Sequence, residues 1–201
     1  MAYIWRKLTN SQRLEVLAHR QIVKRPWRRP PHYDQGHTFY HLTGACYEHR
    51  DWIGRSPQRM EDFCHALVEV FENHPTSEGP AAWCVLPNHY HVLVRTQDLK
   101  SLAAALSRLH GSTSFRWNKE EECRGRKVWH GVADRAMRGG GHFWATTNYI
   151  HHNPVKHGYV TKWDEWPYSS AGDYLREIGR EEAVVIWKKY PVLDYGKGWD
   201  D

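Results

Sequence analysis

The sequence predicts an α+β fold in which helices pack on one face of an antiparallel sheet. Two observations lead to this prediction. Segments with strand and helix periodicity follow one another in the order β-α-β-β-α-β, which is typical of a single sheet domain. A chain of 201 residues with 40% hydrophobic content is also the right size to bury one core.

The first strand and the first core helix lie in residues 38–74. Residues 38–46 have the composition of a strand. Ser56 and Pro57 have the chemistry of an N-cap and a first helical turn, and apolar residues recur behind them at helical spacing. We therefore expect a core-facing helix that ends near His74.

A hairpin and a second helix follow. Residues 82–86 and 89–95 are rich in β-forming residues and are separated by a Pro-Asn turn, which predicts two paired strands. Asp98 can cap the next helix, whose leucines and alanines line one face as far as about Trp117.

The last core elements are a strand and a helix. The charged residues 119–127 are typical of a loop, and residues 128–137 are expected to form a further strand. Three glycines at 139–141 break it. We expect a short helix from about His142 that stops before Pro154, because proline cannot donate the helical hydrogen bond.

Extensions flank this domain on both sides. Residues 1–35 form a basic arm with a short helix over 9–21, followed by prolines that force extended backbone. The sheet domain is expected to occupy residues 36–162. Residues 163–201, rich in Trp and Tyr, are expected to form a helix and a tail that pack on the domain.

Positive charge is concentrated in the arm. The net charge is +5, and residues 1–29 contain a single acid, Glu15. The basic residues of this stretch are Arg6, Lys7, Arg13, Arg20, Lys24, Arg25, Arg28 and Arg29. This asymmetry favours a polyanionic partner, and the abundant aromatic rings can stack on unpaired bases.

Composition argues against several classes of protein. No stretch approaches the roughly 18 apolar residues of a membrane span, and the N-terminus lacks the apolar region of a signal peptide. The four cysteines are widely separated, so neither a zinc ribbon nor a disulfide framework is suggested. We therefore expect a cytoplasmic protein with no membrane partner.

One candidate site is the pair His89 and His91. Because side chains alternate along a strand, both imidazoles project from one face while Tyr90 projects from the other, so two nitrogens can reach one metal ion. The chain has 15 histidines, and spacing alone favours ordinary surface or hydrogen-bonded histidines over a metal site.

The second candidate site ends the last predicted core helix. Tyr149 and Asn153 are one helical turn apart and share a face, provided that the turn persists next to Pro154. Taken alone, Tyr149 is better explained as an amphipathic ring that closes a helix.

The two sites together resemble a known family. LPNHYHVLV at residues 86–94 and NYIHHNPVKHGYV at 148–160 are similar to motifs of the REP-associated tyrosine transposases of bacteria, which are single-tyrosine HUH transposases. Further similar segments are RRPPHYD at 28–34, WPYSS at 166–170 and LDYGKGWD at 193–200. The resemblance covers nearly the whole chain and implies the ferredoxin-like HUH nuclease fold.

The resemblance also implies roles for particular residues. His89 and His91 match the metal-binding histidines, Tyr149 matches the nucleophile, and Asn153 matches the residue that completes the metal shell. His152 is the alternative ligand, because an imidazole is a better metal donor than an amide, although it lies about 100° further round the helix.

The chemistry of these residues agrees with such roles. A tyrosine hydroxyl, with an ordinary pKa near 10, is a poor nucleophile, so a bound Mg²⁺ or Mn²⁺ is needed to polarise the scissile phosphate. Nitrogen ligands suit Mn²⁺ better than Mg²⁺. Attack on phosphorus leaves a 5′-phosphotyrosine and a free 3′-hydroxyl, and the covalent bond allows rejoining without ATP.

Basic residues outside the two motifs are candidates for contacts with DNA phosphates, because guanidinium and ammonium groups pair with them. The DNA-binding candidates are Lys24, Arg28, Arg29, Arg135, Lys156 and His157.

The expected function is therefore that of a transposase, a metal-dependent single-stranded DNA endonuclease and strand transferase acting on hairpin-forming palindromic repeats. The alternatives are a domesticated hairpin-binding protein without cleavage activity, and a metallohydrolase in which His89, His91 and a water attack a small phosphoester. The resemblance favours a bacterial, nucleoid-associated monomer over a dimer with exchanged tyrosine helices.

Overall fold

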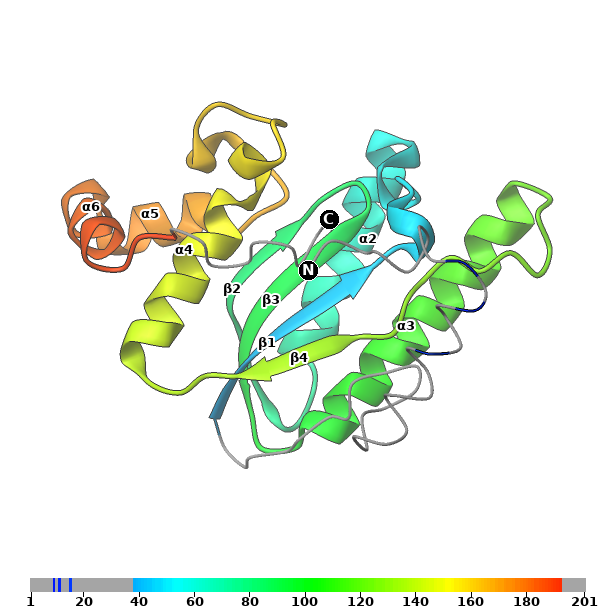
Figure 1. Cartoon of the computed structure of the whole chain (residues 1–201), viewed down its shortest axis with the longest axis horizontal. Coiled ribbons are helices and arrows are strands. Elements are labelled where there is room, and N and C mark those ends of the chain that lie inside the picture. Colours follow the sequence, from blue (N-terminus) through cyan, green and yellow to red (C-terminus); the bar gives the residue numbers. More distant parts are fainter. Residues whose placement is uncertain (1–8, 10, 12–14, 16–37, 193–201) are drawn as a thin grey trace. The chain divides into compact units, whose positions relative to one another are not determined.

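The computed structural model describes residues 38–192 and, outside this range, Thr9, Ser11 and Glu15. Residues 38–192 lie in a compact unit that spans His32–Val192. Within the described residues, a four-stranded antiparallel sheet has the order β2-β3-β1-β4 (Figure 1). With the intervening helices, this order confirms the predicted ferredoxin-like α+β fold. Most of the predicted arm helix and the final segment 193–201 lie outside the described residues.

The central pair of strands agrees closely with the prediction. Strand β1, Thr38–Ala45, pairs with β3, His89–Thr96, along its whole length. The edge strand β2, Ser77–Val85, starts earlier than expected, although it contains Pro80. A proline is tolerated there because an edge strand need not donate every ladder hydrogen bond, and the register of β2 shifts on both sides of Pro80.

The other edge strand is shorter than predicted. Strand β4 covers only Ala133–Ala136, although a strand over 128–137 was expected. The preceding residues run alongside β1 without joining the ladder, and Trp129 makes an isolated bridge to Cys46. Trp129 is instead held by its ring, which stacks on His110 at a centroid distance of 4.1 Å.

Helices α2, Pro57–Glu72, and α3, Leu99–Glu120, begin where the capping residues predicted. The Ser56 side chain accepts a hydrogen bond from the backbone of Arg59, and Asp98 accepts one from Ser101. Both helices cover one face of the sheet, as expected.

The core lies between this sheet face and the two helices. Tyr90, Val92 and Val94 alternate along β3 and face it, and each is at most 1% exposed. Phe63 of α2 and Trp117 of α3 meet there with ring centroids 6.0 Å apart. Burying such large aromatic and aliphatic side chains supplies most of the stabilisation of a domain of this size.

The cysteines are free thiols, as their separation indicated. Cys46, Cys64 and Cys84 are buried and Cys123 is exposed. Burial raises the pKa of Cys46 and Cys64 to about 12 and raises that of Cys84 well above its ordinary value, so these thiols stay protonated and unreactive.

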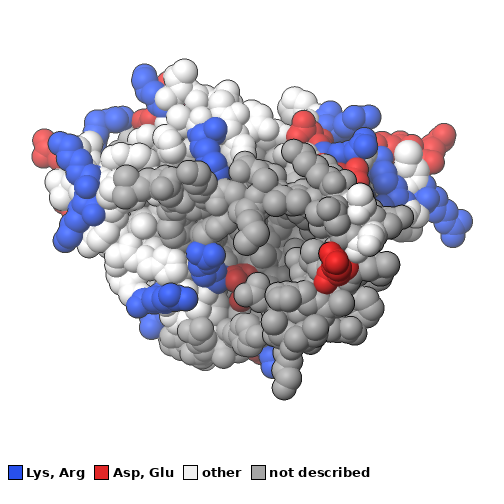
Figure 2. Space-filling model, viewed as in Figure 1, with Lys and Arg blue, Asp and Glu red and all other residues white. Residues whose placement is uncertain are grey.

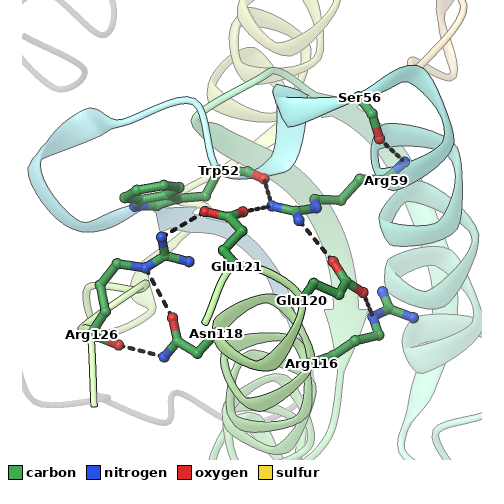
Figure 3. A network of polar contacts seen from close by, with 8 residues as sticks. All are labelled: Trp52, Ser56, Arg59, Arg116, Asn118, Glu120, Glu121 and Arg126. Atoms are coloured by element: carbon green, nitrogen blue, oxygen red, sulfur yellow. Dashed lines mark hydrogen bonds and ion pairs between the residues drawn. The ribbon is translucent and has the colours of Figure 1, made fainter. Parts of the chain in front are cut away.

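The loop after α3 is anchored by ion pairs (Figure 3). Arg59 of α2 donates to Glu121 at 2.6 Å and to Glu120 at 2.7 Å, and Arg126 donates to Glu121 at 2.7 Å. Partial burial alone would raise the pKa of Glu121, but the hydrogen bonds from Arg126 and Arg59 lower it overall. The Arg126 guanidinium also lies 3.9 Å from the centre of the Trp52 ring. This network ties the segment before α2 to the end of α3.

Helix α4, Gly140–Lys156, corrects one prediction. It does not stop before Pro154 but continues through it. Proline removes one helical hydrogen bond, to the carbonyl of Ile150, but only two helical residues follow it, and its ring is buried. Packing therefore outweighs the local preference, and α4 lies against the sheet face opposite α2 and α3.

The segment after α4 forms two helices where one was expected. A short turn, η4 (Trp163–Glu165), precedes α5, Ala171–Ile178, and α6, Arg180–Lys189. The connecting residues cover the edge of β2: the backbone of Val85 donates to Tyr168, and Trp166 Nε1 donates to the carbonyl of Val85 at 2.9 Å. The edge strand is thus protected from further pairing. Among the described residues, no helix is long and apolar enough to cross a bilayer.

Candidate active site

The candidate site begins with the alternation of side chains along β3. His89 and His91 project from the face opposite Tyr90, as predicted, and their ring centroids lie 5.0 Å apart. Both are buried, at 1% and 0% exposure. Two imidazoles are therefore held side by side on the sheet face that α4 covers.

Helix α4 brings the second motif to the same place. Asn153 Oδ1 lies 3.2 Å from His89 Nε2, and the ring centroid of Tyr149 lies 5.2 Å from that of His91. Because α4 persists through Pro154, the two side chains do share a helix face. Four of the predicted site residues, far apart in the sequence, thus converge within one chain.

The Nδ1 atoms of both histidines lie within hydrogen-bond distance of neighbouring side chains. His89 Nδ1 lies 2.6 Å from Asn88 Oδ1, which can only accept, so the proton is on Nδ1. His91 Nδ1 lies 3.0 Å from Thr43 Oγ1 and 3.1 Å from His41 Nε2. Such partners fix the orientation of metal-binding histidines and select Nε2 as the coordinating nitrogen.

The contact between His89 and Asn153 tests whether a cation fits. With its proton on Nδ1, neutral His89 presents a lone pair at Nε2 to the lone pairs of Asn153 Oδ1. Two acceptors at this distance repel each other unless a proton or a cation lies between them. Within residues 38–192, no three His, Cys, Asp or Glu side chains are grouped to hold a metal, so the donor set is two imidazoles and one amide. This set fits Mn²⁺ or Mg²⁺ with positions left for water and phosphate.

His41 is a site residue that sequence reasoning missed. It lies on β1, is 3% exposed, and its ring centroid is 5.0 Å from that of His91 and 6.0 Å from that of Tyr149. The available signal was the alternation in residues 38–46, which places His41 and Thr43 on the same face once β1 and β3 are paired.

Three predicted DNA contacts lie around this site. Lys156 Nζ is 5.3 Å from the centre of the Tyr149 ring, and the His157 ring centroid is 5.1 Å from that of His89. Arg135 is exposed and is paired in register with His41, so it lies on the histidine face of the sheet. The other three, Lys24, Arg28 and Arg29, lie outside the described residues.

His152 does not reach the histidine pair, which corrects its suggested role as an alternative ligand. Its ring faces α6, with a centroid 5.2 Å from that of Trp187. The reason is the rotation of about 100° per helical residue, which turns His152 away when Asn153 faces the sheet. His151 is also turned away: it is buried, lies 3.0 Å from Ser170 Oγ, and burial lowers its pKa to about 3.

Basic side chains of the described residues are spread over the face shown in Figure 2. They lie over α5 and α6, around the C-terminal end of α3 and near the middle of the view, with acidic side chains beside several of them. The candidate site itself is marked by the buried histidines and the buried tyrosine.

Comparison with known proteins supports the same family as the motifs. The chain is 28% identical over 150 residues to a protein of Haemophilus influenzae provisionally named REP-associated tyrosine transposase, covering 67% of this chain and 79% of the relative. It is 26% identical over 142 residues to the REP-associated tyrosine transposase of Escherichia coli K12, covering 67% and 75%. No family model matches the chain.

A solved structure shares the fold. The structure of a REP-associated tyrosine transposase bound to a REP hairpin superposes with a TM-score of 0.55 at 21% identity, covering 75% of this chain and 85% of that one. The chain is therefore similar in sequence to two REP-associated tyrosine transposases and shares the fold of a third structure of that name, in agreement with the resemblance of its two motifs.

Proposed function

We propose that this chain is a metal-dependent single-stranded DNA endonuclease and strand transferase that acts on hairpin-forming palindromic repeats. The observation that carries the proposal is the convergence of Tyr149, Asn153, His89 and His91 at one buried place. The names of the sequence relatives, and the hairpin bound by the structural relative, support the same substrate class.

The proposed reaction is an attack on phosphorus by the Tyr149 hydroxyl. A bond forms between phosphorus and the phenolic oxygen while the bond to the 3′ oxygen breaks, so the 5′ phosphate stays on the tyrosine. The proton lost by the phenol balances the proton gained by the departing 3′ oxygen. A second 3′-hydroxyl end can reverse the step, which joins the strands without an external energy source.

Neighbouring side chains would assist this attack. The Lys156 ammonium, 5.3 Å from the centre of the Tyr149 ring, stabilises negative charge on the phenolic oxygen. His89, His91 and Asn153 would hold the cation, and Mn²⁺ or Mg²⁺ bound there would polarise the scissile phosphate. Burial of His89, His91 and Asn153 strengthens the interaction with the cation, because water screens it less, whereas Lys156 is exposed.

All four of the proposed site residues come from the same chain. Tyr149 lies against the histidines of its own β3, so no exchange of α4 with a second subunit is needed. We therefore propose that the active form is a monomer, which light scattering of the protein bound to hairpin DNA would test.

The decisive experiment is capture of the covalent intermediate. The protein is incubated with Mn²⁺ or Mg²⁺ and a 3′-labelled pool of hairpin oligonucleotides with randomised unpaired flanks. We expect a labelled protein band that survives denaturation, disappears with nuclease digestion, and is absent from Tyr149→Phe. Tyr90→Phe is the matched control, because that tyrosine is equally buried but faces the opposite side of the sheet.

Other outcomes would identify the competing functions. Tight hairpin binding without any covalent band would indicate a binding protein that no longer cleaves DNA. Cleavage that persists in Tyr149→Phe would indicate attack by a metal-bound water and would overturn the tyrosine mechanism.

A further inference from the structure

A cavity lies on the side of α4 that faces away from the sheet. It has a volume of about 280 Å³ and is enclosed by α4, η4, α5 and α6. We call it the α4–α6 cavity and define it by its main lining residues, which are Asn148, His152, Trp163, Tyr174, Arg180 and Trp187. This volume is just below the range of about 300–1,000 Å³ that is typical of small-molecule pockets, so it suits a single ring-shaped fragment.

Aromatic rings from separate elements form its walls. Trp163 of η4 and Tyr174 of α5 have ring centroids 6.4 Å apart at an angle of 62°. Trp187 of α6 packs against His152 of α4, with centroids 5.2 Å apart, and both rings line the cavity. Flat aromatic side chains gathered in this way form a surface on which a planar heterocycle can stack.

The cavity also has hydrogen-bonding groups of both kinds. His152 lines the cavity, and an imidazole ring can offer one nitrogen as a donor and the other as an acceptor. The edge of a nucleobase needs both. Arg180 adds a cation, with its side chain 68% exposed and one nitrogen bonded to Asp164.

The same helix separates this cavity from the candidate active site. Asn148 and His152 line the cavity, whereas the residues that follow them, Tyr149 and Asn153, face the histidine pair. The cavity and the candidate active site therefore lie on different faces of α4. A helix with its side chains is about 10–12 Å across. A strand whose phosphate lies at Tyr149 therefore needs to extend only a few nucleotides to bring a base to the cavity.

We propose that the α4–α6 cavity binds one unpaired nucleobase of the DNA strand, close to the phosphate that Tyr149 attacks. This inference rests on the proposed function for its DNA partner. It assigns to the cavity a role in choosing the cleavage position, because a base seated there fixes the phosphate presented to the tyrosine.

The test couples the DNA and the protein in a double-mutant cycle. One hairpin that binds is taken from the randomised pool, and each unpaired nucleotide in turn is replaced by an abasic site. Binding is measured by fluorescence anisotropy without metal, in the Tyr149→Phe background, so that no cleavage occurs. We expect one position at which loss of the base weakens binding about 5- to 150-fold, the change for one stacked base.

The protein arm of the cycle uses Trp187→Ala and the smaller change His152→Ala. In both variants the abasic substitution at that position should have no further effect, whereas Trp144→Ala, on α4 but outside the cavity, should leave the effect intact. Thermal melting confirms that each variant folds. Independent, additive effects at every position would overturn the inference.

The two proposals fail in distinguishable ways. A covalent tyrosine product without coupling to Trp187 or His152 would leave the proposed function standing and remove the cavity's role. Coupling without any covalent product would keep the cavity as a base-binding site and remove the strand-transfer activity.

Discussion

Strand β3 presents side chains to two different environments, one on each face of the sheet. On one face, Tyr90 and Val92 pack against α2 and α3 in an apolar core. On the other, His89 and His91 meet Asn153 and Tyr149 of α4, and these polar groups are buried almost as completely. Burial of apolar groups stabilises the fold directly, whereas buried polar groups stabilise only where every partner is supplied. The second face is therefore the one at which we propose that the reaction takes place, and substitutions on the two faces should separate stability from activity.

The largest expected effect is on the polar face. His91→Gln removes one of the two nitrogen donors, and we expect a loss of covalent product formation of about 1,000-fold or more, as is common when a catalytic group is lost. Product formation over a range of Mn²⁺ concentrations measures it. An activity within a few-fold of the parent protein would show that the histidine pair is not the metal site.

The corresponding change on the apolar face should act on stability. Leu67→Ala, in α2 and fully buried, is expected to lower the free energy of unfolding by about 2–5 kcal/mol, through lost burial and the resulting cavity. Urea denaturation measures this change. The folded fraction should keep its rate of product formation, and a reduced rate per folded molecule would mean that the two faces are not separable.

The next prediction concerns His151, a buried histidine that is not one of the proposed metal ligands, and tests the effect of burial on its pKa. His151 has a pKa of about 3 in the folded protein because it is buried, against about 6.5 when unfolded. Between these values the unfolded chain binds a proton that the folded chain does not, so this contribution is intact above pH 6.5. It should fall by about 1.4 kcal/mol for each pH unit of acidification toward 3. In His151→Gln, the free energy of unfolding should therefore decrease less steeply with acidification below pH 6.5 than in the parent protein. Equal slopes of unfolding free energy against pH for the two proteins would contradict this prediction.

The smallest effect concerns the neighbour of a proposed ligand. Asn88→Ala removes the acceptor that orients His89, and we expect Mn²⁺ affinity to weaken about 10- to 100-fold, as is usual for such partners. Isothermal titration calorimetry measures it. Asn88→Asp retains an acceptor oxygen and should recover most of the affinity, whereas loss in both variants to the same degree would indicate a general disturbance of the turn.

Interactions between residues close together in the sequence predicted most of the helices and strands, and the placement of two of the four proposed site residues. Ser56 and Asp98 marked the starts of α2 and α3, because capping depends only on residues a few positions apart. Strand alternation placed His89 and His91 together for the same reason. Pro154 misled the prediction of α4, because a proline acts locally while burial is a property of the whole fold. The early start of β2, which includes Pro80, was not predicted, because edge position is also a property of the whole fold.

The sequence by itself therefore determined the order of elements, the family resemblance and the faces on which the motif residues lie. Only the tertiary structure decided that Asn153 rather than His152 meets the histidines, that His41 joins them, and that an aromatic cavity lies behind α4. The physical reason is distance along the chain. Periodicity specifies a direction for each side chain, but which distant side chains share that direction depends on how the sheet and α4 pack against each other.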